Sequence, residues 1–366
     1  MLGSLIRRTL LAKRSVTIVA VATALAAVGV PAPAGAAAMP QTANAAKSAA
    51  GWLAREMTDK QRIELFFESL PGDFPDLTAE AVLDFDAAGV AQQYARKATA
   101  WLAEPTVLPS FLAGQEGLSA VAAHALIILV AVAQGISPRR FGGVDVLAEL
   151  RASRLPSGEF MSGPATPTSE VTNQSMAILA LKRAGGAPAR AVKFLAASQC
   201  PDGGFPDSFE TEPAPPIGSC GSDPLTTSWA IQALLAVGGR HAAVRRALDW
   251  LQAQQRPDGS FFLPADVVSV TGPAAVALAA GGRHPAADRA IAFLKAVQAD
   301  CSAQPVDRGA ISVTGDGVIS GTSISADGTT LATLAAIPAL AGTGIADVSA
   351  AGAHHAAPQL RCTTSG

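Results

Sequence analysis

Polar residues recur in register just before several apolar runs of the sequence, and they are the first candidates for chemistry. These carboxylate, amide, hydroxyl and indole side chains are Glu170, Thr172, Asn173, Gln174, Asp223, Thr226, Thr227, Trp229, Thr271, Asp327, Thr329 and Thr330. If the apolar runs are helices, ordinary N-capping explains such residues, because a side-chain oxygen there accepts from a free backbone N–H. If the helices also form a ring, their starts and positive dipole ends converge on one mouth. That arrangement predicts a ligand site made of Glu170, Asn173, Gln174, Asp223, Thr227 and Trp229.

Two of these residues, Glu170 and Asp223, are also candidates for acid and base catalysis. Glycoside cleavage uses two carboxyl groups that face each other at roughly 5 to 10 Å. Whether Glu170 and Asp223 do so depends on how the fold places the two helix starts. Catalysis by the pair and simple capping therefore both stay open.

The segment between Cys200 and Asp223 is acidic and has no basic residue. Asp202, Asp207 and Glu210 could contribute to a calcium site, which needs six to eight oxygen ligands. The segment has no ordered calcium-loop motif, so we favour a solvated acidic loop and expect no bound metal. Zinc is not expected either, because no two cysteines lie at a two-residue spacing.

The four cysteines suggest two disulfides in an exported chain. Four cysteines allow three connectivities. We favour Cys200 with Cys220, which closes the acidic loop, and Cys301 with Cys362, which ties the C-terminal tail to the fifth hairpin. In the chain-entropy interpretation, a loop the size of the first contributes roughly 3 kcal/mol.

The first 38 residues have the layout of a secretory signal peptide. Four basic residues, Arg7, Arg8, Lys13 and Arg14, precede an apolar run over 16–30 and a small-residue stretch over 34–38. A membrane anchor is the alternative, and the paired arginines are compatible with either the general or the twin-arginine export route. Removal of this segment takes four of the 27 basic and none of the 29 acidic residues, leaving a net charge of −6. We therefore expect a secreted protein with no further membrane span and no nucleic-acid partner.

The pattern over residues 223–262 predicts a buried helix that ends at Gly238-Gly239, then an amphipathic helix, and then a turn at Pro257-Asp258-Gly259. Copies of this unit recur, and large apolar residues mark its outer helix at positions 52, 101, 147, 194, 250 and 293. Six helical hairpins with buried inner helices predict an all-α fold, an (α/α)6 toroid, with an open solenoid as the alternative. We expect a flexible lead-in over 39–50, the toroid over 51–345 and a tail over 346–366. The first inner helix is expected over 77–93 and the sixth over 329–340.

The turns between hairpins resemble a known family. Gln199-x-x-x-Gly203-x-Phe205 and Gln255-x-x-x-Gly259-x-Phe261 resemble the Gln-x-x-x-Gly-x-Trp repeat of squalene and hopene cyclases, with Phe in place of Trp. Arg154-x-x-x-Gly158-x-Phe160 and Glu68-x-x-x-Gly72-x-Phe74 look like weaker copies. The pattern is similar to the wider α/α-toroid superfamily, which includes terpenoid cyclases, protein prenyltransferase β subunits, complement thioester domains and cobalamin carriers. The resemblance implies the fold and leaves the activity open.

The catalytic residues that this resemblance implies are mostly missing. A cyclase of the family carries an Asp-x-Asp-Asp proton donor, and the nearest match, Asp84-Phe85-Asp86-Ala87, lacks the last acid, so Asp86 is a weak candidate. The Asp, Cys and His zinc set of prenyltransferases and the Cys-Gly-Glu-Gln run of thioester proteins are not found. We therefore expect a monomeric, non-catalytic protein that binds an unknown small molecule or protein at the mouth, without a cofactor. The alternatives are a terpenoid-cyclase-type or carbohydrate-active enzyme, and a cobalamin-carrier-like role.

Overall fold

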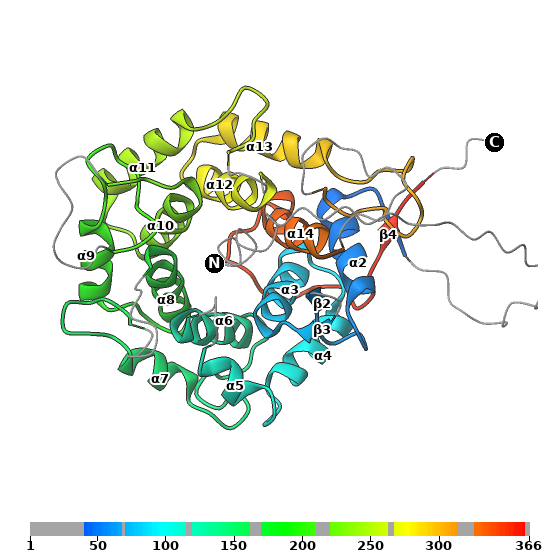
Figure 1. Ribbon diagram of the computed structural model, residues 1–366, viewed down its shortest axis with the longest axis horizontal. Coiled ribbons are helices and arrows are strands. Elements are labelled where there is room, and N and C mark those ends of the chain that lie inside the picture. The colour runs from blue at the N-terminus through cyan, green and yellow to red at the C-terminus, as the bar shows by residue number, and fades with distance from the viewer. Residues whose placement is uncertain are drawn as a thin grey trace, which may run out of the picture.

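The computed structural model is a double ring of helices, one layer inside the other (Figure 1). It describes residues 40–67, 70–114, 119–161, 170–209, 220–262, 267–312 and 326–362. The expected signal peptide therefore lies outside the described residues. The described inner helices are α3 (Pro75–Ala88), α6 (Ala120–Ala133), α8 (Val171–Arg183), α10 (Pro224–Val237), α12 (Val268–Ala280) and α14 (Ala326–Ala341). The described outer helices are α2 (Ala45–Glu56), α4 (Gln92–Leu102), α7 (Val146–Ala152), α9 (Ala189–Ala197), α11 (His241–Ala253) and α13 (His284–Ala296), and the short α5 (Leu108–Leu112) precedes α6.

The inner ring is closed. Its helices contact one another in the order α3, α6, α8, α10, α12 and α14, and α14 then contacts α3. Each inner helix also packs on the outer helix that follows it, and α14 packs on α2, the first outer helix. The last inner helix thus meets both the first inner and the first outer helix, which confirms the toroid and excludes an open stack of the described hairpins.

The two layers differ in composition as their positions require. Apart from His124, helix α6 is apolar on every side, and most of its residues are buried, as expected of a helix enclosed by neighbours. Helix α11 is amphipathic and buries one stripe, formed by Val244, Ala247, Leu248 and Leu251. No described helix is long and apolar enough to cross a membrane.

The Gln-containing turns hold successive outer helices together. Gln199 donates its amide to the carbonyl oxygen of Gly203 and to that of Ala243 in α11, both at 2.8 Å. Gln255 does the same with Gly259 and with Ala286 in α13. These bonds satisfy carbonyls of the turn and of the next helix, so the turns are structural clips between repeats.

Glycine is required in these clips for two reasons. Gly203 has a φ of +101° and Gly259 a φ of +93°, values that side chains with a Cβ rarely adopt. A Cβ at Gly259 would also lie 2.3 Å from the carbonyl oxygen of Arg289 in α13. The turn and the following outer helix therefore approach too closely for any other residue.

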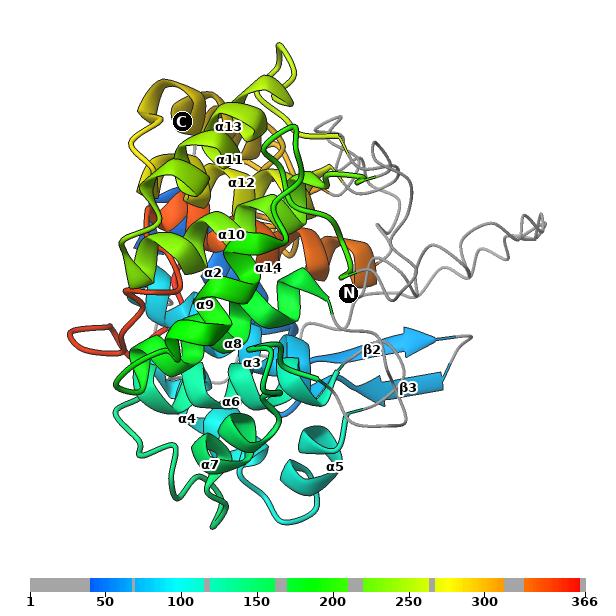
Figure 2. The same cartoon turned by 90° about the vertical axis from the view of Figure 1, so that its left-hand side faces the viewer.

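The C-terminal tail crosses the end of the ring at which the inner helices finish. Arg183, the last residue of α8, donates to the carbonyls of Ile345 and Val348. Ala350 donates to Ala133 at the end of α6, and His354 donates to Gly89 just after α3. Figure 2 shows this segment at one end of the ring and a hairpin at the opposite end, formed by β2 (Glu64–Phe67) and β3 (Leu70–Asp73).

Both expected disulfides are present, Cys200–Cys220 and Cys301–Cys362, with Cα atoms 5.7 Å and 5.6 Å apart. The tail also forms β4 (Gln359–Leu360), which pairs in parallel with β1 (Gln41–Thr42). The structure differs from the flexible lead-in expected over 39–50. Ala45 to Ala50 form the first half of α2, capped by the Asn44 side chain, because small residues pack there in the ring rather than remaining in solvent.

Candidate functional site: an acidic wall inside the ring

A second set of hydrogen bonds shows which side of each inner helix faces outward. In five inner helices, a side-chain oxygen accepts from the backbone N–H of the residue that ends the preceding turn, at 2.9 to 3.0 Å. The acceptors are Thr78, Gln174, Thr227, Thr271 and Thr333, and the donors are Ile63, Phe160, Phe205, Phe261 and Ile311. Because the donors lie in the turns of the outer layer, these acceptors mark the outward side of their helices.

The residue two positions after each acceptor must face the ring interior, because an α-helix turns about 100° per residue. These residues are Glu80, Met176, Trp229, Pro273 and Ala335. Glu80 is exposed, and Trp229, Pro273 and Ala335 are partly exposed, although their helices are otherwise largely buried. Solvent therefore reaches the inside of the ring at this level. Among the described residues, the tail crosses the far end, so the end at which the inner helices begin is the candidate mouth.

One wall of the interior is acidic. Asp76, Glu80 and Asp84 are spaced by four residues on α3 and lie along one face of that helix. Asp76 and Asp84 are only 3% and 4% exposed, and each has a buried carboxylate oxygen without a hydrogen-bond partner. We call these three residues the acid row.

Burial and mutual repulsion change the acidity of the acid row. Burial is the main cause that raises the pKa of Asp76. Burial raises the pKa of Glu80 to about 7, with repulsion from Asp76 adding to the rise. Burial, followed by repulsion from Glu80, raises the pKa of Asp84 well above the usual range. Glu80 is nevertheless exposed to solvent, so its carboxyl group is one that water reaches although many protein atoms surround it.

The wall opposite the acid row is apolar and aromatic. In the ring order, α10 lies across from α3 (Figure 1). Trp229 follows the outward-facing Thr227 by two residues, as Glu80 follows Thr78, so the two side chains face each other at one level. Met176 on α8 and Val276 on α12 are 7% exposed and continue the apolar lining. The interior therefore combines proton-bearing or anionic groups on one side with an indole and aliphatic groups on the others.

Asp86 lies on α3 but outside this wall. Its carboxylate accepts from the Gln134 amide at 2.8 Å and from the Gln92 amide, near the end covered by the tail. Burial raises the pKa of Asp86 to about 6, and the two amides partly oppose that rise. Asp86 is thus partnered, whereas Asp76 and Asp84 each leave one carboxylate oxygen without a partner. The acid row is the feature that the sequence analysis did not identify.

The structure places the two predicted carboxylates at the starts of neighbouring helices. Asp223 caps α10 by accepting from the N–H of Thr226 at 2.9 Å. Glu170 precedes α8 and forms a β-bridge with Ser208, and burial raises its pKa. Since α8 and α10 are adjacent in the ring, these residues do not start from opposite walls. Their use as a catalytic pair stays a prediction.

The other predicted ligand residues fall into two groups. Gln174 and Thr227 are buried and accept from turn N–H groups, and Gln174 also donates to Gly158 and Ala191, so both have structural roles. Asn173 is 1% exposed, and neither its amide nitrogen nor its amide oxygen has a partner. Trp229 faces the interior, as a ligand role requires. Ligand binding by these residues remains a prediction.

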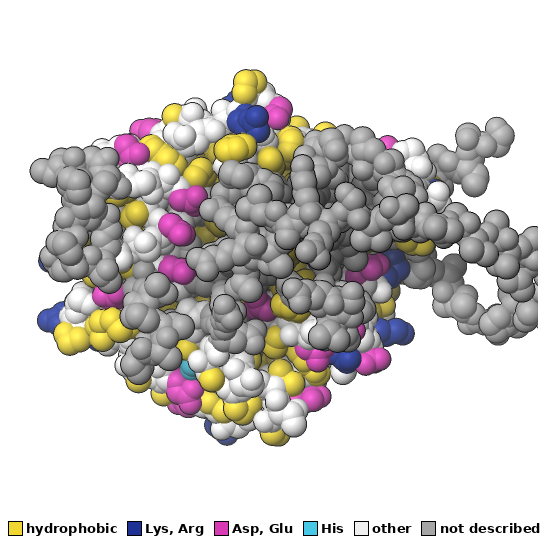
Figure 3. Space-filling view, in the orientation of Figure 1, with side chains coloured by type: hydrophobic (Ala, Val, Ile, Leu, Met, Phe, Trp, Pro, Cys, Tyr) yellow, Lys and Arg dark blue, Asp and Glu magenta, His cyan; other side chains and the backbone are white. Residues whose placement is uncertain are grey.

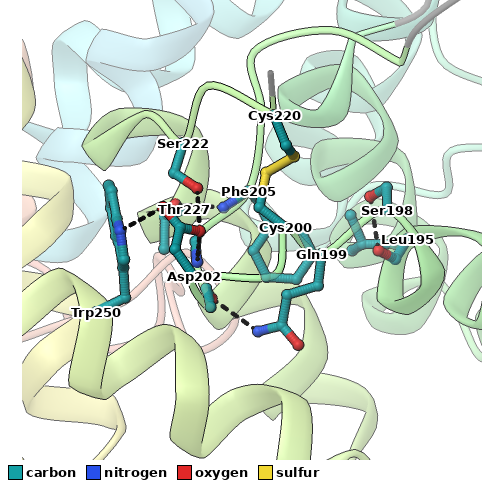
Figure 4. Close-up of a disulfide and its surroundings, with 12 residues drawn as sticks. Leu195, Ser198, Gln199, Cys200, Asp202, Phe205, Cys220, Ser222, Thr227 and Trp250 are labelled. Atoms are coloured by element: carbon teal, nitrogen blue, oxygen red, sulfur yellow. Dashed lines mark hydrogen bonds between the residues drawn. A yellow bond between two sulfur atoms is a disulfide. The ribbon is translucent and has the colours of Figure 1, made fainter. Parts of the chain in front are cut away.

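The acidic loop has a structural explanation in the part that is described. Asp202 accepts from the backbone of Gly204, the hydroxyl of Ser222 and the indole N–H of Trp250, next to the Cys200–Cys220 disulfide (Figure 4). The backbone carbonyl of Asp207 accepts from Val171. Glu210 lies outside the described residues. Among the described residues, no group of three His, Cys, Asp or Glu side chains could hold a metal.

Comparisons with known proteins agree with this architecture. The family model of the squalene-hopene cyclase C-terminal domain matches residues 168–265, the part that contains the two strongest Gln repeats. A search of curated protein sequences finds no significant match.

Solved structures resemble almost the whole toroid. A single-residue variant of the type II terpene cyclase MstE from Scytonema, in complex with its substrate geranylgeranyl dihydroxybenzoate, matches with a TM-score of 0.57 and 14% identity, over 81% of this chain and 95% of that chain. A protein from Actinoplanes matches with a TM-score of 0.55 and 17% identity, over 81% and 98% of the two chains. A protein designated UGL, with dGlcA-Glc-Rha-Glc, matches with a TM-score of 0.54 and 13% identity, over 81% and 95%.

At these identities the structural likeness shows the fold and no activity. One neighbour is described with geranylgeranyl dihydroxybenzoate and another with dGlcA-Glc-Rha-Glc, so proteins of this fold bind different molecules. The closed ring, the Gln clips and the family-model match over residues 168–265 show that the chain is similar in fold to the terpenoid cyclase and prenyltransferase-like α/α-toroid proteins.

Proposed function

We propose that the protein is an exported toroid that binds a small molecule inside its ring without transforming it. The observation that carries the proposal is the exposure of Glu80, Trp229 and Ala335 on the inward faces of helices that are otherwise largely buried. A ring with a purely structural purpose would fill its centre, because unfilled apolar walls forfeit packing energy. An apolar wall with a few polar groups is the usual lining of a small-molecule site.

Export fits the same proposal. The basic and apolar pattern of the first 38 residues is that of a secretory signal, and two disulfides form stably in oxidising compartments. Outside the cell, a carrier needs an enclosed apolar site with one entrance. The tail bonds to the ends of α6 and α8 and leaves the opposite mouth for entry.

A neutral apolar dye tests the proposal directly. N-phenyl-1-naphthylamine fluoresces strongly in apolar sites, and we expect saturable binding to the mature protein. Ala335→Phe adds a ring to the interior and should abolish the signal, whereas Ala242→Phe, at an exposed position of α11, should leave it unchanged. Absence of saturable binding to the wild type, or equal binding by both variants, would overturn the proposal. Native mass spectrometry of the secreted protein would then identify any ligand that co-purifies.

Proton donation to an isoprenoid is a second candidate function, and the acid row favours it. Asp84 is buried, and burial raises its pKa well above the usual range, which is the direction that a general acid needs. Asp84 would replace Asp86, whose carboxylate is occupied by two amides. Turnover of geranylgeranyl-bearing substrates, lost in Asp84→Asn and retained in Asp86→Asn, would establish this activity in place of simple binding. Product analysis by mass spectrometry provides the measurement.

A further inference from the structure

We propose that the ring interior selects ligands that carry an organic cation, such as an alkylammonium group, held between the acid row of α3 and the indole of Trp229. The inference rests on the proposed function, because it names the chemical class that the same interior prefers. It follows from the unpartnered oxygens of the acid row, the position of Trp229 and the distribution of charge around the mouth.

The acid row has acceptor capacity that the described protein does not use. Asp76 Oδ1 and Asp84 Oδ2 are buried without partners, and a buried acceptor without a donor is costly. None of the ion pairs among the described residues includes Asp76, Glu80 or Asp84. A ligand that brings a positive charge and hydrogen-bond donors would supply what these carboxyl groups lack.

Basic side chains of the protein are directed elsewhere. Arg183 is the interior-facing arginine of α8, and its guanidinium donates to tail carbonyls at the closed end. Arg62, near the start of α3, is engaged by Asp59, Glu64 and Asp73. The acid row therefore faces a part of the interior where the described residues provide no neutralising cation.

Trp229 supplies the second half of the site. Its indole lies across the ring from Glu80. Trp229 follows the outward-facing Thr227 by two residues, and Glu80 follows the outward-facing Thr78 by two residues, so both side chains lie at the same level of the ring. An indole face attracts cations by about 0.5 to 2 kcal/mol, and more so when water is excluded. Carboxylates on one wall and an indole on the opposite wall together match an organic cation with an apolar body better than a neutral or anionic ligand.

A metal ion fits this arrangement less well. The three carboxyl groups are spread along about 12 Å of helix instead of converging on one point. No described group of three His, Cys, Asp or Glu residues could hold a metal ion. An extended organic cation can use separated acceptors and the apolar wall, whereas a divalent ion needs six or more oxygens within one shell.

The face that carries the mouth supports the same preference. On the described part of this face, acidic side chains border the central region and basic side chains lie mainly toward the periphery (Figure 3). Carboxylates beside the central region attract cations and repel anions.

Displacement of the neutral dye N-phenyl-1-naphthylamine tests the inference. The competitors are octyltrimethylammonium, 1-octanol and octyl sulfate, which share an eight-carbon chain and differ in charge. We expect octyltrimethylammonium to displace the dye at about tenfold lower concentration than 1-octanol, and octyl sulfate to be the weakest of the three. Glu80→Gln and Trp229→Leu should each reduce the preference for the cation at least threefold.

Matched variants separate the local site from general charge. Glu104→Gln removes one negative charge at an exposed position outside the ring and should leave the preference unchanged, while Trp229→Phe should retain most of it. Equal displacement by the cation and by 1-octanol would overturn the inference and leave the proposed function standing. Failure of the dye itself to bind would contradict both the cation preference and the proposed function. A cation preference that persists in the Glu80→Gln, Asp84→Asn double variant would also overturn the assigned site.

Discussion

The clip layer and the acid row use polar side chains in opposite ways. In the clip layer, the amides of Gln199 and Gln255 each donate to two carbonyls, and Thr227 accepts from a buried N–H. In the acid row, Asp76 and Asp84 are as deeply buried, yet each leaves an oxygen without a partner. Buried polar groups in folded proteins are nearly always satisfied. The clip residues therefore stabilise the ring, and the unused oxygens of the acid row are the acceptors that the proposed ligand would engage.

Gly259→Ala should cause the largest loss of stability, because it breaks a clip. The substitution forces a residue with a Cβ into a φ of +93° and toward a carbonyl oxygen 2.3 Å away. We expect the free energy of unfolding in urea to fall by about 3 kcal/mol or more. Gly221→Ala is the control, because Gly221 has ordinary φ and open space around it. Similar losses in both variants would contradict the structural role of the clip.

Removal of the first disulfide should destabilise the ring without weakening the interior site. Cys200→Ser combined with Cys220→Ser opens a loop with a sequence separation of 20, which is worth about 3 kcal/mol. Dye affinity measured well below the unfolding temperature should match the wild type, because neither cysteine lies on an inner helix. A large drop in dye affinity with an unchanged melting temperature would show that the ligand site lies at the loop instead.

Thr227→Val should have a moderate effect that Thr227→Ser does not reproduce. Valine has nearly the same shape but no acceptor, so the buried N–H of Phe205 loses its partner. We expect a loss of about 1 to 2 kcal/mol in unfolding free energy for valine and much less for serine. Equal effects would mean that packing of the side chain, and not its hydrogen bond, makes Thr227 important.

The clips also show what could be predicted from the sequence. Gln199 and Gln255 stand four residues before their glycines, with three residues in between, so a fixed spacing reveals them. Gln298 makes the same bonds to Gly309 and to Ala45 in α2, which closes the outer layer, but ten residues separate it from its glycine. A fixed spacing cannot find that clip. The six hairpins were predictable because the repeat length can be counted in the sequence. Both disulfides were predictable because each closes a loop whose ends are marked by cysteines.

The acid row depends on facts that a single sequence does not contain. The expected first inner helix began at residue 77, so Asp76 fell outside it, whereas α3 begins at Pro75. Which face of α3 turns inward is set by the bond between Thr78 and Ile63, and Ile63 does not have the aromatic side chain of the repeat. The spacing of the three acids was visible, but their burial and lack of partners required the folded ring.

The smallest expected effect is a dependence of stability on pH. It tests whether ionisation of the acid row destabilises the protein when no ligand is bound. A carboxyl group with a raised pKa in the folded state favours folding while it is protonated. Its contribution is complete below the ordinary carboxyl pKa of about 4 and is lost as the pH rises through the folded value. Glu80 has a pKa of about 7 and Asp84 a strongly raised one, so the free energy of unfolding should fall between about pH 4 and pH 7.

Asp84→Asn removes the most strongly affected group and keeps its shape. We expect this variant to unfold with a flatter pH dependence and, at pH 7, to be about 1 kcal/mol more stable than the wild type. Glu104→Gln, at an exposed site, should reproduce the wild-type curve. If the unfolding free energy of Asp84→Asn depended on pH as steeply as that of the wild type, Asp84 would have a partner in solution. The contrast between the clip layer and the acid row would then lose its basis. If the slope flattens, addition of octyltrimethylammonium to the wild type should flatten it as well, because a bound cation stabilises the ionised acid row.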